Sequence, residues 1–186
     1  MSHGSGGREM KISNSDLASS RRVTNSEPMI LFRVAHQTFA IAAEAVQEIR
    51  STDGLAGAAT EFEQTEVPKV HHTIERAHRT YYVVNVGAHF GLPVTRPTLV
   101  LILRQLRSAV LVDQIERMAD IFTVHPLPRA FTGPERRWYR GLTYLDDHVI
   151  PVIQPNGFLT SDEFNRLDRV AEAVATERQI ERAVQA

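Results

Sequence analysis

Short apolar runs separated by turn residues make up most of the chain from Met29 onward. The runs at 29–34 and 38–42 flank a three-residue turn and predict a β-hairpin. Many short strands with little helix between them favour a mainly β fold, built as barrels or a sandwich, over alternating strands and helices. Further strands are predicted at 79–86, 98–105, 108–115, 118–124, 138–145 and 148–153.

The segment that follows the first hairpin has a different spacing. Ala42, Val46 and Ile49 recur at helical intervals, while Glu48 falls on the opposite side. The pattern predicts a short helix after the 38–42 strand. In this helix we expect Ile49 to lie in the core and Glu48 to face solvent.

A longer helix is predicted at the C-terminal end of the chain. Thr160 and Glu163 match a capping box, and apolar residues recur at helical spacing from Phe164 onward. We therefore expect an amphipathic helix over 161–186 that packs one stripe on the body of the protein. The stripe thins beyond about Thr176, so the end of the helix is expected to fray.

Two polar stretches show neither pattern. Residues 1–28 are rich in Ser, Gly and charge, which predicts a flexible tail. Residues 51–69 contain Gly and Pro breakers and predict a long loop. The expected organisation is a tail at 1–28, a β domain at 29–160 and a C-terminal helix at 161–186.

The β domain contains a weak internal repeat. FRVAHQTFAIA (32–42) aligns with ILRQLRSAVLV (102–112) at an offset of 70, and YYVVNVGAHFGL (81–92) aligns with IPVIQPNGFL (150–159) at 69. Two copies are too few for a solenoid, but they suit two small barrels packed together. The general likeness of one β-hairpin to another is the alternative explanation.

Composition narrows the class of protein. The 21 basic residues nearly balance the 22 acidic ones, so no strong field draws the chain to nucleic acid or to an anionic membrane. The absence of cysteine excludes disulfides and thiolate metal sites and agrees with a reducing compartment. Neither a secretory signal nor an apolar run of about 18 residues is present. We expect a soluble, cytoplasmic protein that does not insert into a membrane.

A histidine cluster offers one candidate chemistry. His71, His72 and His78, with Glu75 between them, have spacings that resemble those of zinc ligands on a helix. No HExxH motif is present, and a solvated basic stretch is the simpler interpretation. No hydrolase, phosphate-loop or dinucleotide motif occurs elsewhere. The sequence therefore predicts no catalytic residue, no metal and no cofactor, and not an enzyme.

A basic and aromatic stretch offers another. Residues Arg136 to Arg140 combine three arginines with Trp138 and Tyr139, a composition that can stack bases and contact phosphates. This favours a nucleic-acid-binding β-barrel as an alternative function. The balanced net charge argues against it, and a partly buried Trp138 is the simpler interpretation.

Four phrases, in order and in register, resemble CheW-like domains, the coupling proteins of bacterial chemotaxis. ILFRVAHQTFAIAAEAVQEIR is similar to the first hairpin and link of that family, with its characteristic VQEI at 46–49. The later phrases are VVNVGAHFGLP (83–93), SAVLVDQIERMADI (108–121) and YRGLTYLDDHVIPVI (139–153). They place Asp113 and Gly141 at the family aspartate and glycine. The resemblance covers about residues 29–160.

This resemblance implies a fold and a role. The fold is two intertwined, five-stranded, SH3-like β-barrels that share an apolar core, followed here by the C-terminal helix. The role is that of a non-enzymatic adaptor in two-component chemosensory signalling. The implied partners are the CheW-like regulatory domain of a CheA-type chemotaxis histidine kinase and the cytoplasmic tip of a methyl-accepting receptor. The nucleic-acid-binding barrel and a metal-dependent enzyme remain the competing hypotheses.

The same resemblance implies a partner-binding surface. In the family the VQEI segment lies by the surface that contacts receptor and kinase. The residues carried over to this chain are Val46, Glu48, Arg50 and, with a one-residue shift of register, Arg76. A charged rim of this kind would select the partner and its register.

One segment departs from the family pattern. The family's NLRG phrase is replaced by VHHTIERAHR, and counting back from Asn85 places Ala77 at the family arginine. We expect strain if His72 or His78 must adopt the left-handed backbone that the missing glycines would allow. The departure predicts that the protein binds its kinase better than a conventional receptor tip.

Overall fold

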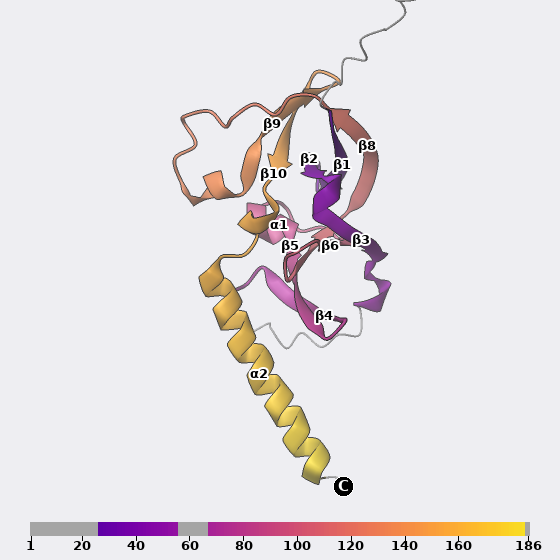
Figure 1. The fold of residues 1–186 in the computed structure, drawn as a ribbon, viewed down its shortest axis with the longest axis vertical. Coiled ribbons are helices and arrows are strands. Elements are labelled where there is room, and N and C mark those ends of the chain that lie inside the picture. The colour runs from indigo at the N-terminus through magenta and orange to yellow at the C-terminus, as the bar shows by residue number, and fades with distance from the viewer. Residues whose placement is uncertain (1–25, 56–66, 185–186) are drawn as a thin grey trace, which may run out of the picture.

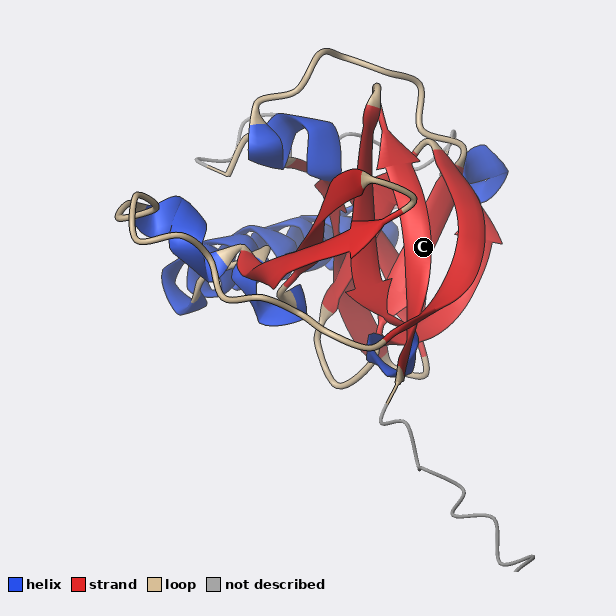
Figure 2. Ribbon diagram, turned by 90° about the horizontal axis from the view of Figure 1, so that it is seen from above, coloured by secondary structure: helices blue, strands red, loops and turns tan. Residues whose placement is uncertain are grey.

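The computed structural model describes residues 26–55 and 67–184, which form two five-stranded β-sheets and a long C-terminal helix (Figure 1). Sheet A has the strand order β8-β1-β2-β10-β9, and sheet B has the order β3-β6-β7-β5-β4. In the view from above in Figure 2, the strands curve strongly and helical segments lie outside them. The expected fold class, mainly β with two five-stranded units and a C-terminal helix, is confirmed.

The chain builds sheet B from one continuous run of strands, and it builds sheet A from the strands before and after that run. The strands of sheet A are β1 (Glu27–Val34), β2 (Gln37–Ala42), β8 (Gln114–Ile121), β9 (Tyr139–Leu145) and β10 (His148–Ile153). The strands of sheet B are β3 (Val46–Ser51), β4 (Val70–Arg76), β5 (Arg79–Asn85), β6 (Leu99–Leu103) and β7 (Ser108–Val112). The helices are α1 (Val86–Phe90) and α2 (Ser161–Val184), with 3-10 turns η1 (Ala43–Ala45), η2 (Thr52–Gly54), η3 (Pro134–Arg137) and η4 (Pro155–Gly157).

The internal repeat is visible in this topology. β1–β5 and α1 correspond in order to β6–β10 and η4, and each sheet combines strands from both halves of the chain. Left-handed backbone recurs at the same offsets, since Ala35 and Gln105 have φ of 53° and 61°, and the Ala77–His78 turn matches the Asp146–Asp147 turn. The halves are therefore intertwined, and neither has a complete sheet of its own.

Neither sheet closes into a complete barrel through backbone pairing. In the described residues the edge strands β8 and β9 of sheet A are not paired with each other, and the same holds for β3 and β4 of sheet B. Ion pairs link these edges instead: Arg117 with Asp146 in sheet A, and Arg76 with Glu48 in sheet B. The barrels expected from the sequence are thus curved open sheets whose edges are tied by side chains.

One apolar core joins the two sheets. The shared cluster draws residues from both sheets, from α1 and α2, and from the segment between η4 and α2. Burying such side chains is the main source of stability in a domain of this size. The largest fully buried members are Phe32, Ile41, Tyr82, Leu101, Leu103, Ile153, Phe158 and Leu167.

Helix α2 begins with the predicted capping box. The Glu163 backbone N–H donates to Thr160 Oγ1 at 3.2 Å, and the Thr160 backbone N–H donates to Glu163 Oε2 at 2.8 Å. Leu167 is fully buried in the shared core, as expected for a helix that packs an apolar stripe on the body. The helix extends along sheet B and continues past it to Val184, well beyond the Thr176 at which fraying was expected (Figure 1).

Several local predictions are wrong. Residues 46–49 form strand β3 rather than a helix, since the backbone of 46–51 pairs with β6. Two elements, β4 and α1, were missed, and β1 starts at Glu27 inside the expected tail. Short apolar-polar patterns fit both periods, so long-range pairing decides between them. Residues 1–25 and 56–66, which hold most of the expected tail and loop, lie outside the described residues.

Over the part of the chain that the structure describes, no helix combines the length and apolar character needed to cross a membrane.

Candidate partner-binding surface

Strand β3 presents an edge of sheet B. It pairs with β6 through Glu48 opposite Ile102 and Arg50 opposite Val100, and it stands at the end of the strand order. Gln47 is skipped in the register, which makes a β-bulge next to Glu48. An edge strand of this kind offers backbone and side chains to another protein.

Three of the four predicted site residues come together on this edge. The Arg50 Nε–H donates to Glu48 Oε1, and the guanidinium of Arg76, at the end of β4, donates to Glu48 Oε2. The hydrogen bond from Arg50 is the main cause that lowers the pKa of Glu48 below its usual value. We call Glu48, Arg50 and Arg76 the charged rim; it stays partly exposed, so a partner can reach it.

The fourth predicted residue lies elsewhere. Val46 is 8% exposed and belongs to the shared core, whereas Ile49, which was expected in the core, is 43% exposed. The strand geometry and the bulge at Gln47 explain this reversal, because a strand alternates its faces and a bulge shifts the alternation. The side chain of Val46 is directed inward, and its role in binding stays a prediction. Ile49 is the exposed apolar residue beside the charged rim.

The turn after Arg76 has the backbone that we expected the sequence to disfavour. Ala77 and His78 have φ of 48° and 60°, so both adopt the left-handed backbone that we expected to strain a histidine. They connect β4 and β5 as a tight two-residue hairpin, a turn that needs positive φ at both positions. The missing glycines therefore do not prevent the turn. The position aligned with the family arginine is occupied by an alanine at the tip of this hairpin.

The histidine cluster does not converge. His71 and His72 are consecutive on β4, His78 lies in the following turn, and Glu75 Oε1 accepts a hydrogen bond from Thr80 Oγ1 at 2.6 Å. Nowhere in residues 26–55 or 67–184 do three His, Cys, Asp or Glu side chains gather as metal ligands would. The metal-enzyme hypothesis gains no support from this arrangement.

The basic stretch from Arg136 to Arg140 is also dispersed. Arg136 Nη1 donates to the Phe131 carbonyl at 2.9 Å, and Arg140 Nη1 donates to Glu27 Oε1 at 2.6 Å. Trp138 packs on the His89 ring with centroids 4.6 Å apart. Two of the three arginines are thus engaged within the protein, and the stretch does not form one basic surface.

Asp113, which aligns with the family aspartate, holds a turn. Its Oδ2 accepts from the backbone N–H of Ala35 at 2.6 Å, and its Oδ1 accepts from Thr95 Oγ1 at 2.7 Å. Ala35 has positive φ, so this carboxylate stabilises the strained turn between β1 and β2. Asp113 therefore has a structural role, and it supports a turn that is distant from it in the sequence.

Gly141, which aligns with the family glycine, allows a close approach of two segments. Its neighbour Leu142 pairs with His125 in an isolated bridge on the outside of β9. A Cβ atom at position 141 would lie 2.3 Å from the His125 carbonyl oxygen. Glycine is required here because there is no room for a side chain. Its backbone conformation is not the reason, since its φ is not in the left-handed region.

Sheet A exposes a second surface that the sequence did not predict. Tyr144 on β9 is 62% exposed, and Val149, 49% exposed, stands opposite it on β10, while Met118 on β8, at the other edge of the strand order, is 64% exposed. We call Tyr144 and Val149 the apolar rim. Grouped apolar side chains on a surface mark a site for another protein more often than single ones do. The alternation of apolar and polar residues along β8 and β9 was the signal available in the sequence. It does not show which face of the sheet the rest of the protein covers.

Comparison with known proteins identifies a family and a solved structure of similar fold. A family model described as the CheW-like domain matches residues 28–163. Among solved structures, the chain is similar to the crystal structure of the scaffolding protein TtCheW from Thermoanaerobacter tengcongensis. The TM-score is 0.59 at 16% identity, over 69% of this chain and 89% of that one. A comparison with curated proteins found no match.

Proposed function

The chain belongs to the CheW-like domain family, and from that premise we propose that it is a non-enzymatic adaptor that couples chemoreceptors to a chemotaxis histidine kinase. The observation that carries the proposal is the edge of β3, where the family's VQEI phrase bears a partly exposed, charged rim. An edge strand supplies area and backbone groups, and a charged rim selects the partner and its register.

We propose the CheW-like regulatory domain of a CheA-type kinase as the main partner of this surface. Ile49 gives the rim an exposed apolar residue, and Glu48 with its two arginines supplies both signs of charge. A contact of this kind fits another small β-barrel better than a catalytic substrate. Its expected affinity is micromolar or tighter, as for many signalling interfaces.

The cytoplasmic tip of a conventional receptor is proposed as the weaker partner. Ala77 stands where the family carries an arginine, and it cannot form the planar, forked hydrogen bonds of a guanidinium. Arg76 lies next to it, but its guanidinium is bonded to Glu48. To bind a receptor, Arg76 would have to give up this partner.

Isothermal titration calorimetry with the kinase regulatory domain and with a receptor cytoplasmic fragment tests the proposal. We expect wild type to bind the kinase domain, and Glu48→Arg to weaken that binding because it places three positive charges together. Arg76→Ala is the companion variant for the receptor arm. Folded wild-type protein that gives no heat with the kinase domain at tens of micromolar would refute the adaptor. Equal binding of both partners, with Arg76→Ala indifferent to each, would refute only the ranking.

A further inference from the structure

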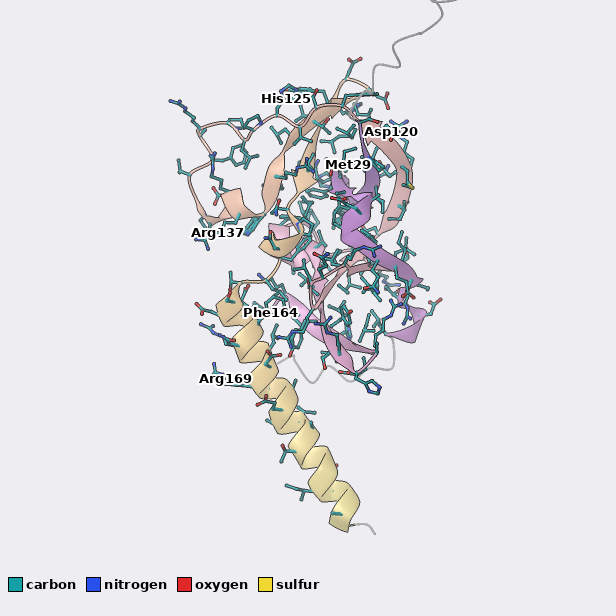
Figure 3. The ribbon with its side chains drawn as sticks, viewed as in Figure 1. Met29, Asp120, His125, Arg137, Phe164 and Arg169 are labelled. Atoms are coloured by element: carbon teal, nitrogen blue, oxygen red, sulfur yellow. The ribbon has the colours of Figure 1, made fainter. Side chains whose placement is uncertain are left out.

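A cavity of about 670 Å³ lies where α2 joins the body. It is bordered by the β6–β7 turn, η3, η4 and the first turn of α2. Two neighbouring hollows of about 470 and 400 Å³ share Leu106 with it. Together they form one groove that passes over Leu106, and Figure 3 shows Arg137 and Phe164 on the same flank, where α2 begins.

The floor of this groove is apolar. Leu106 lines all three hollows, and Phe164 lines two of them. Trp138, the single tryptophan of the chain, lines the largest hollow and remains partly exposed. These side chains offer a place for an apolar residue of a ligand. Aromatic and arginine residues together are typical of surfaces that bind other proteins.

The margins of the groove are basic. Arg137 lines the largest hollow, Arg104 the second and Arg79 the third. Arg104 gives one hydrogen bond to the Glu44 carbonyl at 3.0 Å, while neither Arg79 nor Arg137 has an ion-pair partner in the described part of the chain. We call Leu106, Phe164, Trp138 and these three arginines the arginine groove.

Few negative charges balance these margins. A fourth arginine, Arg107, is neutralised by Asp168, to which it donates two hydrogen bonds of 2.9 and 2.7 Å. Among the residues that line the three hollows, Glu44 carries the one carboxylate. The groove therefore has a net positive charge, although the whole chain has a formal net charge of −1. An unpaired guanidinium is a preferred partner of carboxylates because its fork binds both oxygens.

We propose that the arginine groove binds an acidic segment of a partner protein. Carboxylates of that segment pair with the three arginines, and one of its apolar side chains packs on the floor. The inference does not rest on the adaptor role, because Phe164 lies beyond residues 28–163, which match the family model, and the charged rim is no part of the groove.

Tryptophan emission and peptide anisotropy test this inference on the full-length protein. The probe is a fluorescein-labelled peptide of Glu and Leu, and an unlabelled copy serves for the emission of Trp138. We expect saturable binding and a shifted emission. In the double variant Arg79→Ala/Arg137→Ala, binding should weaken about tenfold or more, since each lost charge-assisted contact removes part of the affinity.

Matched controls separate the contributions. Arg96→Ala removes another exposed arginine that lines none of the three hollows, and it should leave binding unchanged. A Gln–Leu peptide should bind weakly because it lacks charge, and a Glu–Ser peptide because it lacks the apolar anchor. Denaturant unfolding of each variant verifies that the fold is retained.

Several outcomes would overturn the inference. They are an absence of binding in both readouts, equal binding of the Gln–Leu peptide, an Arg79→Ala/Arg137→Ala variant that binds like wild type, and oligothymidylate that binds as tightly as the Glu–Leu peptide. The last would assign the groove to phosphates. Because the kinase titration is a separate measurement, each proposal can fail without the other.

Discussion

Glu48 on β3 and Arg117 on β8 stand at matching places of the two sheets, 69 residues apart, and carry opposite charges. Each follows a bulge in an edge strand, and each forms an ion pair that reaches the other edge of its own sheet. The partner of Glu48 is Arg76, the last residue of β4, and the partner of Arg117 is Asp146, in the turn after β9. We call each of these ion pairs the tie of its sheet. The tie has the same position in both halves of the repeat, but the charges are exchanged, since β3 carries the acidic residue and β8 carries the basic one.

The surroundings of the two ties differ. In sheet B the Arg76 and Glu48 side chains are 32% and 28% exposed, and a second arginine, Arg50, joins them. In sheet A the Arg117 and Asp146 side chains are 52% and 70% exposed, and this sheet bears the apolar rim. Helix α2 packs on sheet B through Tyr82 of β5 and Arg107 of the β6–β7 turn, both bonded to Asp168. One strand plan therefore supports two different surfaces. A protein with a duplicated fold can in this way present unlike faces to unlike partners.

Removal of α2 should produce the largest effect and break the comparison. Ending the chain after Thr160 removes the fully buried Leu167 and the partly buried Phe164, a loss of about 3–6 kcal/mol of unfolding free energy. Denaturant unfolding measures it. As a matched control, a chain that ends after Thr176 keeps the buried and partly buried residues that the structure describes in the helix, and it should unfold like wild type. If the longer deletion also unfolds like wild type, α2 is not docked.

The stability of the fold should depend on pH through His89. This residue of α1 is 7% exposed, and burial is the main cause that lowers its pKa from 6.5 to about 4. Since the folded pKa is the lower one, His89 stabilises the fold fully above pH 6.5, and this contribution falls between pH 6.5 and about 4. The total loss is about 3 kcal/mol.

The change His89→Phe tests this expectation. Unfolding free energies between pH 6.5 and about 5, above the range in which most carboxylates titrate, should decrease steeply in wild type and remain flat in the variant. If the unfolding free energy falls equally with pH in both proteins, His89 is not the group whose titration causes the loss.

A methyl group at position 141 should disturb sheet A alone. Gly141→Ala places a Cβ 2.3 Å from the His125 carbonyl oxygen and 2.7 Å from Val124 Cγ1, so the bridge to β9 must shift. We expect a loss of about 1–3 kcal/mol. Gly54→Ala in η2 is the control, because none of the residues that the structure describes lies within 4 Å of its added Cβ. Similar denaturation midpoints for Gly141→Ala and wild type would contradict the close approach.

The smallest effects should come from the two ties themselves. Arg117→Gln removes an exposed ion pair and should cost less than about 1 kcal/mol. Glu48→Gln should lower the melting temperature further, because Arg50 and Arg76 lose their shared carboxylate and repel each other. Thermal unfolding at low and high salt measures both variants, and salt should reduce the difference between them. A larger effect for Arg117→Gln would reverse the comparison.

Much of this architecture follows from local sequence. The hairpins, the offset of the repeat and the capping box at Thr160 depend on neighbouring residues or on alternation along one strand, and the structure confirms each of them. The phrase VQEI also identified the region of the charged rim. Strand β4 was missed because its polar histidines hide the alternation, and 46–49 was assigned to the wrong period because four residues fit a helix and a strand alike.

The sequence by itself determined the fold class, the repeat and the two residue types that meet at the rim. Only the tertiary structure decided that Arg76 reaches Glu48, that Val46 turns inward while Ile49 is exposed, and that three arginines border one groove. The reason is physical: alternation fixes which residues share a face, but pairing between distant strands fixes which face is covered and which side chains become neighbours.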